Sequence, residues 1–343
     1  MKKLLFLLSS FIFFTLTAFF CLHAPLMSDS FFSDALGFTA PGVSPEIKVL
    51  PTICPDLIYK QCIASASTIK KVSSPKPAEK SESKPLSYIS DPVPSGIIET
   101  TISKGGTSLS GAEINNETDY DLAEALREVD ISGSPTVLIV HTHASESYRP
   151  SFTYSYTPTD NSRTEDTDFN VVRVGKELAT YLSSYGINVI HDSSLNDYPS
   201  YNGSYQKTLK LIESHLKKNP SIDMIIDLHR DAMERADGTK ISTVCTIENE
   251  KAAQVMLVAG TDQSGLSHDN WRDNFSFAVK LQNIINSKFP YLARPINVRK
   301  ERFNGHLSKK ELIIEVGTTG NTLDEALVSA RALASSINEF YKG

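Results

Sequence analysis

The sequence predicts an α/β domain with a mostly parallel central sheet flanked by helices. Short apolar runs alternate with amphipathic helical patterns from about Ile97 to the C-terminus, and Gly186 and Pro220 stand where two of these helices would end. With 343 residues, 40% of them hydrophobic, the chain can bury such a core. A net charge of −6 without any long basic run argues against a nucleic-acid partner.

Residues 1–24 are predicted to form a transmembrane anchor. Two lysines precede an apolar run from Leu4 to about Leu22, which is long enough to span a bilayer. By the positive-inside rule, the rest of the chain is then extracytoplasmic. A cleaved signal peptide is the alternative, although the cleavage site before Pro25 is poor.

Two segments separate the anchor from the predicted domain at residues 97–343. Residues 25–65 form a juxtamembrane segment without clear periodicity, and residues 66–96 are rich in Ser, Lys and Pro, which is typical of a flexible linker. Cys54 and Cys62 could pair outside the cell, and the sequence leaves this pairing and the oligomeric state open.

Within the domain, strands and helices are expected in alternation. The expected strands are Thr136–Val140, "INVIH" at 187–191, "IDMIIDLH" at 222–229, Ile241–Ile247, Gln254–Ala259 and "ELIIEVG" at 311–317. The expected helices have apolar faces at Val171, Val174, Leu178 and Leu182, at Tyr205, Leu209, Ile212 and Leu216, at Phe275, Val279 and Ile284, and from Leu323 to about Tyr341.

Polar residues with metal-binding chemistry follow three of these strands. His141, His143 and Glu146 follow the first, His229 ends the third, and Glu315 lies in the last. Parallel strands bring such residues together at the carboxyl edge of the sheet. Two histidines, a carboxylate ligand and a further glutamate make up the donor set and general base of a catalytic zinc site. The competing interpretation is that each histidine is structural.

The two histidines after the first strand need separate assignments. Alternation along a strand sends His141 and His143 to the same side, so this geometry does not choose between them. We assign the metal to His143 because it lies further out at the sheet edge, and expect His141 to pack behind it.

Five motifs of the sequence resemble motifs of one known family. "HTHASESY", "NVVRVGKEL", "DLHRDA", "RFN" and "IIEVGTTGNTLDEA" occur in the order found in the stage II sporulation protein P family, membrane-anchored peptidoglycan hydrolases of endospore-forming bacteria. That family is similar to zinc-dependent N-acetylmuramoyl-L-alanine amidases. The resemblance therefore implies a zinc amidase-like catalytic domain at residues 97–343, with Zn²⁺ as its cofactor.

The resemblance also implies roles for individual residues. His143 and His229 become metal ligands and Glu315 becomes the catalytic general base. Arg302 and Asn304, around the "RFN" motif, become substrate-binding residues that could assist in holding an oxyanion.

The acidic zinc ligand is open between two positions. In related amidases a glutamate precedes a helix some distance after the first histidine, and Asp166 or Glu165 would occupy that place. Glu146 instead makes His-x-x-Glu with His143, the spacing of zinc carboxypeptidases. We expect Glu146 to be the ligand because it follows the strand end closely, with Asp166 as the alternative.

The implied activity is cleavage of stem peptides from glycan strands during sporulation engulfment, with an endopeptidase activity on cross-links. Implied partners are peptidoglycan and the stage II sporulation proteins D and M, at the septal or forespore-engulfing membrane. Two alternatives remain: a zinc peptidase of carboxypeptidase type, which would release single amino acids, and a catalytically silent wall-binding scaffold, which would bind no zinc.

Overall fold

The structure, a computed structural model, describes residues 92–131, 135–158 and 162–343. The expected anchor, the juxtamembrane segment with Cys54 and Cys62, and most of the linker lie outside these residues. Among the described residues, no helix is long and apolar enough to cross a membrane. The first strand begins at Ile97.

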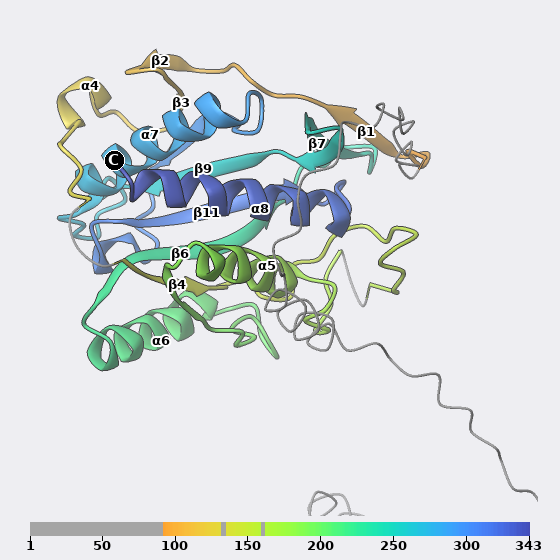
Figure 1. Cartoon of the computed structure of the whole chain (residues 1–343), viewed down its shortest axis with the longest axis horizontal. Helices are drawn as coiled ribbons and strands as arrows, with labels where there is room; N and C mark the ends of the chain where they lie inside the picture. The colour runs from red at the N-terminus through yellow and green to blue at the C-terminus, as the bar shows by residue number, and fades with distance from the viewer. Residues whose placement is uncertain (1–91, 132–134, 159–161) are drawn as a thin grey trace, which may run out of the picture. The chain divides into compact units, whose positions relative to one another are not determined.

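The described chain forms two sheets and five α-helices (Figure 1). The strands are β1 (Ile97–Thr100), β2 (Thr107–Leu109), β3 (Ala112–Asn116), β4 (Thr136–Val140), β5 (Asn188–His191), β6 (Ile222–Asp231), β7 (Lys240–Ile247), β8 (Glu250–Ala253), β9 (Val255–Gly260), β10 (Ile296–Arg299) and β11 (Glu311–Thr318). The helices are α4 (Leu122–Ala125), α5 (Val171–Ser184), α6 (Ser204–Lys218), α7 (Trp271–Lys288) and α8 (Leu323–Phe340), with a 3₁₀ turn at Gly305–Leu307.

The large sheet is mixed, which corrects the expectation of a mostly parallel sheet. Its strand order is β2-β3-β10-β9-β11-β6-β4-β5, and a small sheet joins β1, β7 and β8. The β9–β11 and β2–β3 pairs are antiparallel. The physical reason is the β7–β8 hairpin, whose turn residues Glu248 and Asn249 both have positive φ, 49° and 71°. Such turns match the twist of antiparallel strands, and this one reverses the chain before β9.

Helix α5 agrees with its sequence pattern. Its predicted apolar face is buried. The Asn170 side chain caps the first turn by accepting the N–H of Val172, and Gly186 adopts a left-handed φ of 82° just beyond the end. Gly186 therefore ends the helix as predicted, and the Asn170 cap adds a signal at its start.

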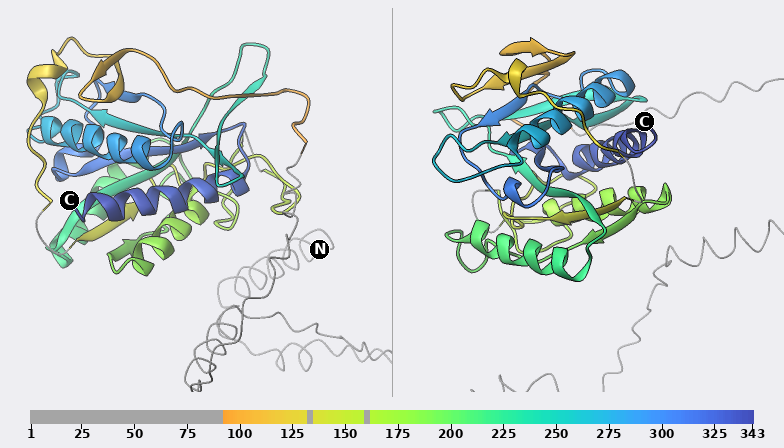
Figure 2. Two further views of the ribbon diagram at one scale, coloured as in Figure 1. Left: turned by 45° about the horizontal axis from the view of Figure 1, so that its top comes forward. Right: turned by 90° about the vertical axis from the view of Figure 1, so that its left-hand side faces the viewer.

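Alternation along β6 sorts its side chains onto two faces of the sheet. Met224, Ile226 and Leu228 join the main core with α5, α7 and α8, while Ile225 packs in a second cluster with Ile212 of α6. Figure 1 shows α5 and α8 side by side, and Figure 2 shows α6 apart from α8. The same alternation places Asp227 and His229 on the α6 face.

Candidate active site

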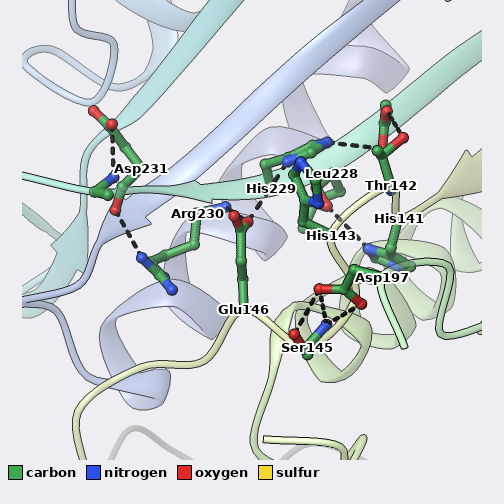
Figure 3. A network of polar contacts seen from close by, with 12 residues as sticks. His141, Thr142, His143, Ser145, Glu146, Asp197, Leu228, His229, Arg230 and Asp231 are labelled. Carbon is green, nitrogen blue, oxygen red and sulfur yellow. Dashed lines mark hydrogen bonds and ion pairs between the residues drawn. The ribbon is translucent and has the colours of Figure 1, made fainter. Parts of the chain in front are cut away.

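The candidate site lies on the α6 face, at the carboxyl ends of β4 and β6. His143 and Glu146 follow β4, His229 belongs to β6, and Glu315 of β11 pairs in register with His229 across a parallel ladder. The rings of His143 and His229 meet edge to face with centroids 5.3 Å apart. Figure 3 shows Glu146, from the segment after β4, reaching His229 of β6.

His229 is held between two carboxylates. Its Nε2 lies 3.0 Å from Oδ1 of Asp227, and its Nδ1 lies 3.5 Å from Oε2 of Glu146. Asp227 is itself fixed, since its Oδ1 accepts the N–H and its Oδ2 accepts the hydroxyl of Thr142. Burial opposes a charge on His229, but Asp227 and Glu146 outweigh it and raise the His229 pKa well above its ordinary value.

Glu146 is a buried carboxylate with several positive partners. Its Oε2 accepts the backbone N–H of Arg230 at 3.0 Å, and its Oε1 lies 3.6 Å from Nη2 of Arg163. Burial raises its pKa, but His229, Arg230 and His143 lower it, and the balance places the pKa at about 2. Glu146 therefore stays ionised at neutral pH, the state that a metal ligand requires.

His143 is enclosed by aromatic rings from the segment before α6 and from its first turn. Tyr201 stacks on its face with centroids 4.3 Å apart, and Tyr205 meets it edge-on at 5.5 Å. Ser204 Oγ lies 3.3 Å from its Nδ1. Burial and the neighbouring His229 lower the His143 pKa, which favours the neutral imidazole that binds metals.

Glu315 stands beside this cluster without a fixed partner. Its Oε2 is buried and has no hydrogen-bond partner among the described residues. Burial raises its pKa to about 8, with His229 opposing the rise and Glu146 adding to it. A carboxyl with a pKa near neutrality can both accept and return a proton.

The donors fit zinc in chemistry, although the ion is not placed by the structure. Within the described part of the chain, no three or more His, Cys, Asp or Glu side chains are already arranged to hold a metal ion. Zinc binding therefore stays a prediction. In its favour, metal-binding histidines usually have a carboxylate beside their second ring nitrogen, and Oδ1 of Asp227 lies 3.0 Å from Nε2 of His229 without forming a hydrogen bond in the observed geometry. Ligands about 2.1 Å from a tetrahedral ion lie about 3.4 Å apart, close to the 3.5 Å between His229 and Glu146.

The other residues predicted for the site lie outside this cluster. Asp166, the alternative acidic ligand, is exposed, and its Oδ1 accepts the N–H of Asp168. Arg302 donates to the Ser267 carbonyl and Asn304 to the Tyr205 carbonyl, and both line a pocket together with Tyr205. Their assignment to substrate binding stays a prediction.

His141 lies behind the cluster. It is fully buried, with Nδ1 3.0 Å from the Leu228 carbonyl and Nε2 2.9 Å from Nε2 of His191. Burial and the neighbouring His191 lower the His141 pKa to about 3, so it is neutral. Nδ1–H then donates to Leu228, and Nε2 accepts from His191. Gly175 of α5 makes room for this pair, because a Cβ there would lie 2.6 Å from His141 Nε2.

Sequence reasoning missed Asp227 and Tyr205. Asp227 stands two residues before His229, and strand alternation could have placed both on one face. Tyr205 was expected on the core face of its helix, but of that face only Ile212 is fully buried, together with Ser204 and Thr208. Only the positions of neighbouring segments give Tyr205 its place beside His143.

Comparison with known proteins now decides the family. The profile of the stage II sporulation protein P (SpoIIP) family matches residues 63–338. The chain belongs to this family. Stage II sporulation protein P of Bacillus subtilis (strain 168) is 28% identical over 216 residues, covering 60% of this chain and 51% of that protein. The chain thus spans about half the length of this SpoIIP relative.

Solved amidase structures resemble the SpoIIP-family chain distantly. The CwlD amidase from Clostridioides difficile, in complex with the GerS lipoprotein, is 13% identical with a TM-score of 0.38, covering 61% of this chain and 98% of that one. N-acetylmuramoyl-L-alanine amidase AmiC2 of Nostoc punctiforme is 12% identical with a TM-score of 0.34, covering 62% of this chain and 97% of that one. Scores this low carry no conclusion about activity.

Proposed function

We propose that this protein is a zinc-dependent peptidoglycan hydrolase that cleaves the amide between N-acetylmuramic acid and L-alanine. The observation that carries the proposal is the arrangement of His229 between Glu146 and Asp227, beside His143 and in register with Glu315. Membership in the SpoIIP family supports a substrate in the cell wall.

His143, Glu146 and His229 would hold the zinc ion. When bound, zinc would supply a Lewis acid for the lactyl carbonyl and lower the pKa of water to about 7. Asp227 lies beside Nε2 of the His229 ring, and Nδ1 faces Glu146. The ionised Glu146 balances the positive charge of the ion, and Arg163 and the Arg230 N–H keep that carboxylate in place.

Glu315 moves the proton in this mechanism. When it is ionised, Glu315 can take a proton from water and return it to the leaving amine of L-alanine, and its Oε2 has no competing partner among the described residues. The phenol of Tyr205 stays protonated, since burial and then the charges of Asp227, Glu315 and Glu146 raise its pKa. Tyr205 can therefore donate a hydrogen bond to negative charge that develops on the substrate.

The proposal also includes the setting of the reaction. An anchor at residues 1–24 would tether the domain to the outer face of the membrane, where it would act on peptidoglycan during engulfment with the stage II sporulation proteins D and M. These elements rest on the sequence pattern and on the family.

The test is to incubate the full chain with purified peptidoglycan, with and without a chelator and added zinc. The expected products are intact stem peptides and glycan strands with free lactyl carboxylates, and the chelator should stop their release. His229→Ala should be inactive, whereas Lys217→Ala, a change at the far end of α6, should retain activity. Release of single amino acids would instead indicate a carboxypeptidase, and full activity of His229→Ala would refute the metal mechanism.

A further inference from the structure

A second pocket shares a wall with the candidate site. It encloses about 320 Å³ and is lined by residues from the first half of α6 and from the loops after β9 and β10, a size at the lower end of small-ligand sites. Tyr205 forms the common wall. Its ring contacts both the ring of His143 and the ring of Phe303, with the Tyr205 and Phe303 centroids 5.6 Å apart. Tyr205 therefore borders both the candidate site and this pocket.

The walls of the pocket are mainly apolar. Leu209, Leu266, Phe303 and the Tyr205 ring supply them, and Leu266 is 56% exposed. Asn304 also lines the pocket, but its amide nitrogen already donates to the Tyr205 carbonyl. Gln206, Ser264 and Glu301 add polar groups to the lining. The apolar part of the walls suits the small apolar side chains of a peptide.

Arg302 provides the positive charge of the pocket. Its Nη1 donates to the Ser267 carbonyl, which fixes the guanidinium, and its buried Nε has no hydrogen-bond partner among the described residues. The neighbouring carboxylate of Glu301 is 3.2 Å from Nε of Arg299. A guanidinium held in this way can offer the N–H donors of Nη2 to a carboxylate.

The loop that carries Arg302 is built into the fold. Phe303 has a positive φ of 52°, a conformation that costs a non-glycine residue energy and persists only where the surroundings impose it. Gly260 allows the loop to lie directly on β9, because a Cβ there would be 2.4 Å from the Glu301 carbonyl oxygen. The position of Arg302 beside Tyr205 is therefore set by packing.

We propose that this pocket binds the peptide side of the scissile bond, with Arg302 binding the α-carboxylate of the second residue of the stem peptide. The proposal rests on the proposed amidase function, in which L-alanine follows the cleaved bond and a γ-linked D-glutamate follows L-alanine. The methyl group of alanine then meets apolar walls, and the free α-carboxylate meets the guanidinium. Arg302 becomes a specificity residue that distinguishes a free carboxylate from a carboxamide.

The test compares two soluble muropeptides that differ only in this α-carboxylate, free in one and amidated in the other. With the full chain, KM should be about 10- to 100-fold lower for the acid, the range expected for a charged hydrogen bond. Arg302→Gln should raise KM for the acid to the value for the amide, and Arg302→Lys should restore part of the preference. The matched control is Lys300→Gln, which removes an exposed charge outside the pocket and should keep the full preference.

A second measurement separates the pocket from the reaction. Calorimetry with the free peptide L-Ala-γ-D-Glu needs no bond cleavage, and it should show binding that Arg302→Gln weakens and Lys300→Gln does not. If the peptide binds but neither muropeptide is hydrolysed, the proposed amidase function is refuted, while peptide binding by the pocket is supported. Equal KM values for the two muropeptides in the unaltered protein, or a preference that survives Arg302→Gln, would overturn the proposal for Arg302.

Discussion

Glu311, at the start of β11, should make the stability of the domain depend strongly on pH. Its side chain is 4% exposed, and its Oε1 has no hydrogen-bond partner among the described residues. Burial, and after it the charge of Asp227, raise its pKa from 4.5 to about 8. Between these values the folded protein holds a proton that the unfolded chain has released, so stability falls as pH rises.

The size of this effect follows from the difference between the pKa of Glu311 in the unfolded chain and its pKa in the folded protein. At about 1.36 kcal/mol per pH unit, the free energy of unfolding should fall by about 5 kcal/mol from pH 4.5 to about 8 on account of this group. Glu311→Gln keeps the shape of the protonated side chain but cannot ionise. Its stability should equal that of the unaltered protein within about 1 kcal/mol at pH 4.5 and exceed it by several kcal/mol at pH 8.

Urea unfolding of the full chain at several pH values, followed by circular dichroism, checks this prediction. Glu213→Gln is the matched control, because Glu213 is exposed on α6 and its replacement should leave the pH profile unchanged. A Glu311→Gln variant with the same pH profile as the unaltered protein would refute the reasoning and would mean that Glu311 finds a compensating partner.

Three further changes test the site and its support. Asp227→Asn should weaken zinc binding about 10- to 100-fold, because the carboxylate that orients His229 is lost, as measured by titration against a competing chelator. Glu146→Gln should remove tight zinc binding and Asp166→Asn should not, and the opposite result would transfer the acidic ligand to Asp166. Gly175→Ala should destabilise the fold by about 1–3 kcal/mol in thermal unfolding, since the new methyl group would overlap the buried histidine pair. A gain of about 1 kcal/mol, the helix propensity of alanine over glycine, would show that the pair can move aside.

The strands that carry the site could be predicted because each is buried on both faces. Thr136–Val140 was predicted with its observed bounds, and the runs that became β6 and β11 were found with ends shifted by one or two residues. Such strands have long apolar stretches, which a sequence shows clearly. The polar residues that interrupt or end them are then conspicuous, and this is why His229 and Glu315 could be named.

The missed parts of the fold have weaker local signals. β2 and β3 are short strands at one edge of the large sheet, partly exposed, and lack a long apolar run. The direction of β9 depends on the hairpin turn at Glu248 and Asn249, which contains no glycine, the residue that most strongly marks such turns. The turn therefore escaped notice, and the sheet was predicted to be mostly parallel.

The missed parts of the site depend on contacts between distant segments. Tyr205 and His143 are separated by 61 intervening residues and meet only because α6 packs near the end of β4. Arg302 looked like a group for the reacting centre because it lies in a motif with Asn304, but both line a neighbouring pocket. The motif places Arg302 and Asn304 close together but does not give their distance from His143.

The register of β11 against β6 sets the spacing between the proton-transfer group and its neighbouring metal ligand. Glu315 lies opposite His229, and the regular ladder ends just after it, before Gly317. Neighbouring strands are about 4.8 Å apart, so this spacing is independent of the length of the intervening loops. Insertions there could enlarge the substrate surface without altering the chemistry. A slip of β11 by one residue, in contrast, would point Ile314 or Val316 at His229 and leave a folded protein without its acid–base group.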